Sequence, residues 1–419
     1  MTQKKLHITN EAPTTIMTDF HTFINYLSSH PIKLTKTKQE LAKKDLRALY
    51  ELLPNLGLEV GEHSTQSYYP VINLFMELSF KLDLIRKASK GSTIVIEIDE
   101  TQLQALEKLT MTEQYVSLLQ CFWLQADWDT LQGALHAQKP MNVDALFEHL
   151  KKLPVDQHFS LQSNKSLQHF VVTYGHFLLY FQYFGFWNVA LDEQIEPKTK
   201  VMAVAIEMKP FLKSLIPTLQ TSFESREDLF DGGILSMFDT IFGMEQPDEL
   251  EEVDLEVEIM TTAEFVAELK PLFEEGQLEN VLQAKEKVIK HGEYLFKVAL
   301  SGSCWRTIAL HDSQTLLDLH TWIQRAFSFM DDHLYAFYMD GQPYSRNCYN
   351  APSDNAGPYV DEVTIAELYL EEGQQFLYLF DFGDEWLFQV IVEKIYEGVD
   401  DCVPGIRKEK GNAPVQYQN

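Results

Sequence analysis

Three carboxylates and one imidazole near the C-terminus are residue types from which a metal site could be built. Asp381 and Asp384 flank a glycine in the segment 376–393, which reads FLYLFDFGDEWLFQVIVE, and Glu393 ends that segment. His333 lies further upstream. Oxygen and imidazole ligands suit Mg²⁺, Mn²⁺ or Zn²⁺. The four residues therefore form a candidate ligand or metal site of the kind that a metal-dependent hydrolase would use.

A structural interpretation of the same residues is the one we favour. Asp381 and Asp384 can cap backbone amides of a turn, and Glu393 can end a strand in water. His333 follows two aspartates at the start of a strand, where a turn or core-edge histidine is expected. Arg306 can place its guanidinium against the acidic turn as a bidentate pair that fixes the fold, with an anion or ligand contact as the alternative. No cofactor is predicted.

Sequence signatures of several enzyme classes are missing. The chain contains no HExxH, GxSxG, GxGxxG or GxxxxGK sequence. These motifs are the usual grounds for assigning a chain to the proteases, esterases, dinucleotide enzymes or phosphate-loop NTPases, so the sequence does not support such an assignment. The triplet at 381–383 spells DFG, but no glycine-rich loop or HRD-type loop accompanies it, which excludes a kinase. His169 and His176 lie seven residues apart on one predicted helix, too far for a shared metal.

The segment 376–393 itself predicts a β-hairpin, because apolar side chains alternate on both sides of a turn at 381–385. Gly383 is expected to take the positive φ that a tight reversal needs. Since both faces are apolar, we expect a central pair of strands covered on both sides. One face should hold Phe376, Tyr378, Phe380, Trp386, Phe388, Val390 and Val392, and the other Leu377, Leu379, Leu387 and Ile391.

Composition and charge limit the function further. The chain has 419 residues, 45% of them hydrophobic and 12% aromatic, which suits two or three globular domains. A formal charge of −28 argues against a protein that coats nucleic acid or an anionic membrane. Four widely spaced cysteines and the lack of a signal peptide predict a cytoplasmic protein with free thiols. The long uncharged stretch 166–191 contains histidines and tyrosines, so we expect a buried helix and a strand rather than a membrane span.

Charge is segregated along the chain. The first fifty residues carry eight Lys and Arg against four Asp and Glu, and most of the basic residues fall in one predicted helix that starts near residue 36. A solvated helix face is the favoured interpretation, and contact with nucleic acid or an acidic partner is the alternative. Residues 245–258 hold eight acids and no base, as expected of an acidic linker. The basic residues are Lys36, Lys38, Lys43, Lys44 and Arg47.

The N-terminal part predicts helix, hairpin and helix twice. The first set covers a helix at 69–84, a hairpin ending at 98 with its tip at 87–91, and a helix capped by Asp99. The second covers a helix at 170–184, strands at 186–191 and 201–206, and a helix at 209–219. This order resembles winged-helix units, which contact either DNA or protein.

The fold class expected is α+β, with a mostly helical N-terminal region of two winged-helix-like units and a C-terminal α+β domain with a mainly antiparallel sheet. In that domain Thr315 should open a helix with Asp318 completing a capping box. The predicted domains are a helical winged-helix-like unit at 1–135, a second one at 136–244, an acidic linker with connecting helices at 245–289, and the α+β domain at 290–419.

A resemblance to a known family rests on the segments 294–298, 305–306, 316–323, 332–337, 380–386 and 411–417. In these segments the C-terminal domain resembles the plasmid pRiA4b ORF-3-like family, bacterial proteins also labelled as passengers of mobile elements. The family has no established activity, but some members are labelled resolvase-like or are fused to a repressor-type DNA-binding domain, which implies DNA-linked biology. This sequence departs from the family at Phe388, where many relatives have His, and that weakens a metal site on the hairpin.

The sequence therefore predicts a non-enzymatic cytoplasmic binding or adaptor protein, with a protein or a DNA-bound complex as partner. A metal-dependent hydrolase with its carboxylates at the 381–384 turn is the alternative.

Overall fold

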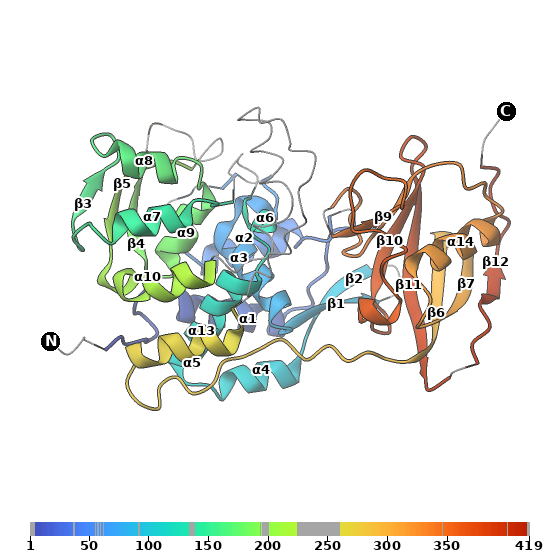
Figure 1. Cartoon of the computed structure of the whole chain (residues 1–419), viewed down its shortest axis with the longest axis horizontal. Coiled ribbons are helices and arrows are strands. Elements are labelled where there is room, and N and C mark those ends of the chain that lie inside the picture. The colour runs from blue at the N-terminus through green and yellow to red at the C-terminus, as the bar shows by residue number, and fades with distance from the viewer. Residues whose placement is uncertain are drawn as a thin grey trace, which may run out of the picture. The chain divides into compact units, whose positions relative to one another are not determined.

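The computed structural model divides the chain into two compact units, and each is described by itself (Figure 1). The first comprises 1–32, 40–86 and 96–285, and the second comprises 33–39, 87–95 and 286–419. The structure describes residues 5–416 apart from 37, 55, 57, 59, 62, 91–92, 134–138, 193, 195–200, 224–259, 346 and 400. The predicted acidic linker at 245–258 lies outside the described residues.

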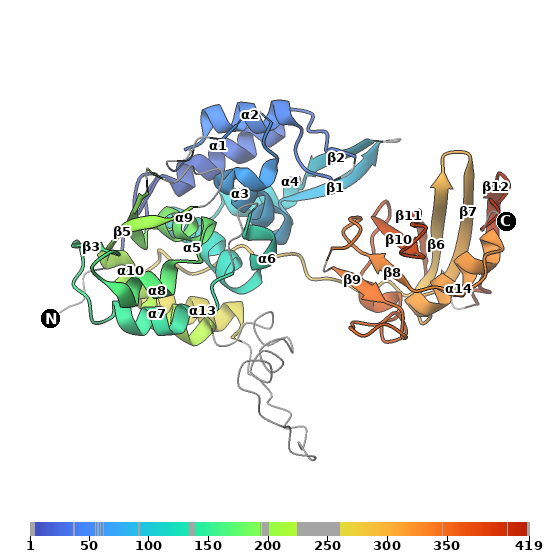
Figure 2. The same cartoon turned by 90° about the horizontal axis from the view of Figure 1, so that it is seen from above.

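The first unit is mainly helical, with a small antiparallel sheet in the order β3-β5-β4. α1, α2 and α3 pack together (Figure 2), and α9 packs against β4 (Figure 1). The helices are α1 (Ile16–Ser29), α2 (Lys43–Leu52), η1 (Gln66–Tyr68), α3 (Pro70–Lys81), α4 (Glu100–Glu107), α5 (Met111–Gln120), the π-helical η2 (Cys121–Gln125), α6 (Trp128–Leu131), α7 (Val143–Leu150), α8 (Lys165–Val171), α9 (His176–Tyr183), α10 (Pro210–Phe223), α13 (Thr262–Leu269) and η3 (Lys270–Leu272). The strands are β3 (His158–Ser160), β4 (Trp187–Leu191) and β5 (Ala203–Met208). A separate hairpin pairs β1 (Ile85–Lys90) with β2 (Thr93–Ile98), and its residues 87–95 belong to the second unit.

The core of this unit is aromatic. Trp123, Trp128 and Trp187 are fully buried. Each indole N–H donates to a backbone carbonyl at 2.8 to 3.0 Å, which removes the penalty of burying that donor. The rings pack edge to face and offset with Phe122, Phe177 and their neighbours.

Both predicted helix–hairpin–helix orders are present, as α3-β1-β2-α4 and α9-β4-β5-α10. Asp99 caps α4 as predicted, accepting a hydrogen bond from the Gln102 amide at 3.0 Å. The helix predicted over 170–184 is wrong as a single element, because the chain breaks at Gly175, where φ is +52°. The break places His169 on α8 and His176 on α9. The winged-helix interpretation stays a prediction.

The connecting helix predicted up to residue 289 ends early, at η3. From there the chain is extended, and residues 277–285, here called the strap, lie along α5. The Glu113 carboxylate accepts from the amides of Glu279 and Asn280 at 2.9 and 2.8 Å, and the Ser117 hydroxyl accepts from Leu282 at 2.8 Å. Side chains of α5 thus satisfy backbone groups that a helix would satisfy internally.

The second unit is an antiparallel sheet of seven strands with α14 packed on one face (Figure 1). Thr315 and Asp318 form the predicted capping box of α14. The expected α+β class is confirmed. The strand order is β12-β7-β6-β11-β10-β8-β9. The elements are β6 (Gly292–Ser301), β7 (Cys304–His311), α14 (Leu316–Phe327), β8 (Tyr335–Tyr338), β9 (Cys348–Asn350), η4 (Ala366–Leu368), β10 (Gln375–Phe380), β11 (Trp386–Glu397) and β12 (Gly405–Lys410).

The predicted hairpin is β10 and β11, in the middle of this sheet. Its aromatic face is buried in the core beneath α14, as predicted. The expectation that both faces are covered is wrong for β11, because Leu387 is 39% exposed and Gln389 is exposed on the opposite face. One helix is enough to cover only one side of an antiparallel sheet.

Candidate functional site

The acidic turn between β10 and β11 is built by its own first carboxylate. Asp381 is 7% exposed, and its Oδ1 accepts from the amides of Gly383 at 2.9 Å and Asp384 at 3.2 Å. The positive φ angles fall on Asp381 (+58°) and Glu385 (+50°) rather than on Gly383. An aspartate tolerates this conformation better than most residues because its side chain bonds locally.

Of the predicted metal or ligand residues, the structure brings together only His333 and Asp381. His333 Nε2 lies 3.5 Å from Asp381 Oδ2. Asp384 is exposed at the tip of the turn. Glu393 sits in a β-bulge further along β11 and accepts from the Thr307 hydroxyl at 3.1 Å. Among the residues that the structure describes, no group of three or more His, Cys, Asp and Glu side chains is placed to hold a metal ion.

Arg306 does not meet the acidic turn, so the predicted pair with Asp381 or Asp384 is wrong. Its Nε donates to the carbonyl of Ala326 at 3.0 Å, near the end of α14, and an η nitrogen donates to the carbonyl of Lys410 at 3.0 Å. The guanidinium also lies 4.9 Å from the centre of the Phe327 ring. Carbonyls at a helix C-terminus lack partners within the helix, and this buried cation satisfies one of them.

The predicted basic residues divide between a turn and a helix. α2 begins only at Lys43, so Lys36 and Lys38 lie in the preceding turn. Lys43, Lys44 and Arg47 are exposed on α2, and Leu46 and Leu49 are buried on its other side.

A buried polar network lies between α14 and the sheet, and the sequence argument did not single it out. His320 is fully buried and its Nδ1 lies 2.7 Å from the Tyr378 hydroxyl. Gln324 donates to the same hydroxyl at 2.8 Å. The imidazole stacks on Tyr335 with ring centres 3.6 Å apart. Nε2 lies 3.1 Å from Asp331 Oδ1, although not aligned as a hydrogen bond.

The titratable groups of this network interact with one another and not with a ligand. Burial lowers the pKa of His320, and the nearby Asp331 carboxylate opposes that shift. Burial also raises the pKa of Tyr378 well above its ordinary value. Asp331 is the exposed member of the network, since 59% of its side-chain surface is accessible to solvent. Because Tyr378 and His320 have no exposed surface, they cannot reach a substrate, and we assign them to the architecture of the core.

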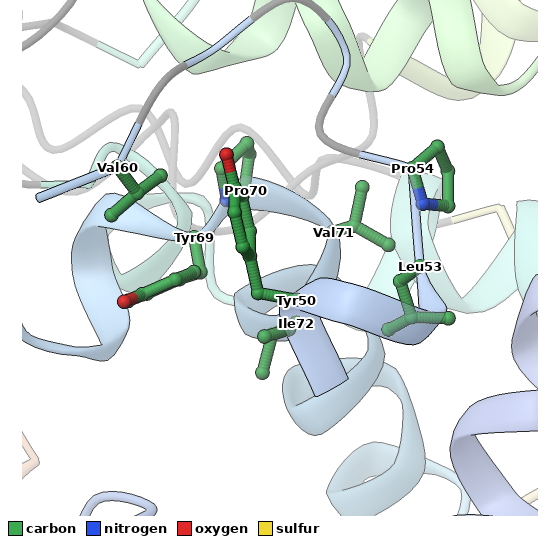
Figure 3. A pocket seen from close by; sticks show the side chains of 8 residues that line it. All are labelled: Tyr50, Leu53, Pro54, Val60, Tyr69, Pro70, Val71 and Ile72. Carbon is green, nitrogen blue, oxygen red and sulfur yellow. The ribbon is translucent and has the colours of Figure 1, made fainter. Parts of the chain in front are cut away.

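An apolar pocket of about 10 Å³ lies in the first unit, next to α2 and the start of α3 (Figure 3). That space is about what one water molecule needs. Tyr50 and Tyr69 meet edge to face there, at 5.6 Å between ring centres. The pocket therefore has neither the room nor the polar groups of a substrate site. Its lining residues are Tyr50, Leu53, Pro54, Val60, Tyr69, Pro70, Val71 and Ile72.

The sheet of the second unit places cations and a tryptophan on the face opposite α14. Arg306 and its ion-pair partner Glu409, 3.7 Å away, mark the α14 side of β7 and β12. Alternation along each strand puts the neighbouring residues on the other side. Lys297 lies over the Trp305 ring at 4.9 Å. We call this surface the basic sheet face, and it consists of Lys297, Trp305, Lys408 and Lys410.

None of the described helices has the length and apolar character needed to cross a membrane. All four cysteines are free.

Comparisons with known proteins match part of the chain. No curated protein matches the chain. A crystal structure of a protein of unknown function from Methanosarcina mazei Go1 is 26% identical, over 30% of this chain and 72% of that one, with a TM-score of 0.26. Residues 293–416 match the family described as plasmid pRiA4b ORF-3-like protein, so the C-terminal part of this chain is a domain of that family.

Proposed function

We propose that this chain is a non-enzymatic, cytoplasmic binding protein that associates with nucleic acid, and that the basic sheet face makes the contact. The observation that carries the proposal is the gathering of Lys297, Lys408 and Lys410 around Trp305 on three adjacent strands, β6, β7 and β12. Lysines on one surface neutralise phosphates and release their counterions.

The charge of the rest of the chain supports contact with nucleic acid at one small surface, and not binding that coats the nucleic acid. The whole chain carries −28 charges, so phosphates are repelled at long range and attracted only where cations are concentrated. One acid, Glu393, reaches this surface, where its carboxylate accepts a hydrogen bond from Thr307 between Lys408 and Lys297. Lys408 and Lys410 are exposed. The family name, which refers to a plasmid reading frame, is compatible with a role on mobile DNA.

A second nucleic-acid contact, through Lys43, Lys44 and Arg47 of α2, remains part of the proposal. Insertion of a winged-helix recognition helix into a groove is not part of it. α3 and α9 precede the two hairpins, and most of their residues are buried in the first unit. A helix buried in this way cannot present base-reading side chains.

Fluorescence anisotropy with the full chain and labelled DNA over a salt series tests the proposal. We expect the chain to bind DNA at low salt and the affinity to fall as salt rises. The double substitution Lys408→Glu with Lys410→Glu should abolish this binding. The double substitution Lys43→Glu with Lys44→Glu measures how much of the DNA affinity comes from α2. Lys151→Glu with Lys152→Glu is the matched control, because both of these lysines are exposed and belong to neither surface. The proposal fails if the unmodified chain does not bind at low salt.

A metal-dependent hydrolase is the second candidate, and the approach of His333 to Asp381 is the observation that favours it. Elemental analysis of the purified protein, followed by metal titration of the Asp381→Ala and Asp384→Ala variants, tests this candidate. It requires bound metal in the unmodified chain and weaker binding in both variants. Equal titration curves for all three proteins would rule it out.

A further inference from the structure

The pairing register of the second unit orders side chains into rows across the face opposite α14, where Lys408, Lys410 and Gln389 are exposed and Thr307 is buried. One row runs from Lys410 on β12 to Trp305 on β7, Ala299 on β6 and Gln389 on β11. The next row runs from Lys408 to Thr307, Lys297, Ile391 and Gln375. Neighbouring strands lie about 4.8 Å apart, so each row spans a surface several side chains wide.

The rows change in character from the edge of the sheet inwards. Lys408 and Lys410 stand on β12, Trp305 and Thr307 on β7, and Ala299 and Lys297 on β6. Further in, β11 and β10 bring Ile391 and two glutamines, of which Gln389 donates to Gln375. The rows thus set lysines beside one aromatic ring, and a nucleotide offers a charged phosphate and a flat base to match them.

We infer that the basic sheet face binds single-stranded DNA, with phosphates along Lys408 and Lys410 and an unpaired base stacked on Trp305. This inference rests on the proposed function and names its ligand. Lys297 lies over one face of the indole, so the base is assigned to the other face, and Ala299, the neighbour of Trp305 in the row, is small. Every base has a π-face, so stacking of this kind selects unpaired bases without selecting sequence.

Duplex DNA fits this surface less well. The bases of a duplex are stacked on each other, and a broad sheet face does not enter a groove as a helix or a two-stranded ribbon does. Duplex DNA could therefore offer only phosphates to the lysines. Single-stranded DNA adds the base contact, which is the source of the preference.

RNA is disfavoured by the apolar part of the rows. A ribose above Ala299 and Ile391 would bury its 2′-hydroxyl without a hydrogen-bond partner, and such a group loses its water. Deoxyribose has no such group. An acidic peptide shares the charge of DNA but lacks rings that could stack on Trp305.

The test compares four labelled probes on the full chain, namely single-stranded DNA, the duplex and the RNA of the same sequence, and polyglutamate. We expect single-stranded DNA to bind most tightly, with a slope of log affinity against log salt of about −1.4, as two lysine–phosphate contacts would give. Trp305→Ala should weaken single-stranded DNA about 5- to 100-fold and leave duplex binding unchanged. Trp305→Phe, which keeps a ring, should retain most of the affinity.

Photo-crosslinking of a bromodeoxyuridine-substituted strand to the unmodified chain gives a readout that does not depend on the folding of a variant. We expect the crosslink at Trp305. Equal affinity for strand and duplex, or for strand and polyglutamate, with no effect of Trp305→Ala would overturn the inference and leave the proposed function standing. Tighter binding of RNA than of DNA would overturn the choice of sugar. Failure of every probe to bind at low salt would overturn both proposals.

Discussion

The Tyr378 hydroxyl donates to Nδ1 of His320 across 2.7 Å, linking the middle of β10 to the buried side of α14. The direction follows from Asp331, whose carboxylate lies 3.1 Å from Nε2 and can only accept, so the neutral imidazole offers Nδ1 as an acceptor, while Gln324 donates to the same tyrosine oxygen. His320 then carries its own proton on Nε2, facing Asp331. One hydroxyl therefore satisfies two other buried side chains.

Replacing Tyr378 by Phe should destabilise the second unit by about 2 to 3 kcal/mol. The substitution keeps the ring but leaves both His320 and Gln324 without their partner in a site from which water is excluded. Urea unfolding followed by circular dichroism measures the change. Tyr396→Phe is the control, because Tyr396 is 47% exposed and its hydroxyl is open to water. Equal stability of the two variants would contradict the role assigned to Tyr378.

The first unit should lose stability in mild acid because of His176. This side chain is fully buried, and neither ring nitrogen has a hydrogen-bond partner among the described residues. Burial lowers the pKa of His176 from 6.5 to about 4. Below pH 6.5 the unfolded chain takes up a proton that the folded chain refuses, so the free energy of unfolding falls until about pH 4. The loss over that range is about 3 kcal/mol.

A pH series of urea unfolding curves for the unmodified chain and His176→Leu isolates this contribution. The variant should show a shallower decline of stability between pH 6.5 and 4, because its position 176 no longer titrates. His169→Leu removes an exposed histidine of the adjacent helix and should follow the unmodified chain. Parallel curves for all three proteins would show that His176 is not the source.

Asp381→Ala should destabilise the β10–β11 turn by about 2 kcal/mol. It removes the acceptor of two amide hydrogen bonds and puts alanine at a φ of +58°, where a side chain without a local hydrogen bond is strained. Asp381→Asn keeps the acceptor and tolerates the conformation, so it should lose less than half of that. Asp384→Ala, at an exposed position, should fall within about 0.5 kcal/mol of the unmodified chain. Thermal unfolding of the three variants ranks them.

Glu113→Ala should free the strap from α5. The carboxylate accepts the amides of Glu279 and Asn280, and those groups would then exchange with solvent. Hydrogen exchange followed by mass spectrometry should show faster exchange across 277–285 and little change in α10. Glu107→Ala on α4 is the matched control, because Glu107 is exposed. Unchanged exchange of the strap in Glu113→Ala would mean that its apolar contacts suffice to hold it.

Local patterns predicted most of the second unit correctly. Alternating residues predicted the β10–β11 hairpin, and Thr315 with Asp318 predicted the start of α14. These signals are contained within a few residues. The buried face of β10 and β11 was also predicted, because an aromatic row on a strand requires a partner surface wherever the strand lies.

The failures concern features that depend on distant residues. The break at Gly175 interrupts a stretch that has good helical spacing, and only its surroundings in the fold require it. The strap is extended because Glu113 and Ser117, more than 150 residues away, accept its amides. His320 lies within one of the family segments, and its place on the apolar side of α14 is the signal that could have identified it as a buried polar group.

The two outermost strands of the seven-stranded sheet offer poor edges for the addition of strands from other molecules. β9 has three residues, and β12 carries a bulge between Ile406 and Lys408 and ends in alternating charges. A short border and a kinked, lysine-bearing one are both poor templates for an incoming strand from a neighbouring molecule. The domain should thus stay dispersed at high concentration, without fibrils, even though one broad side of it is left bare.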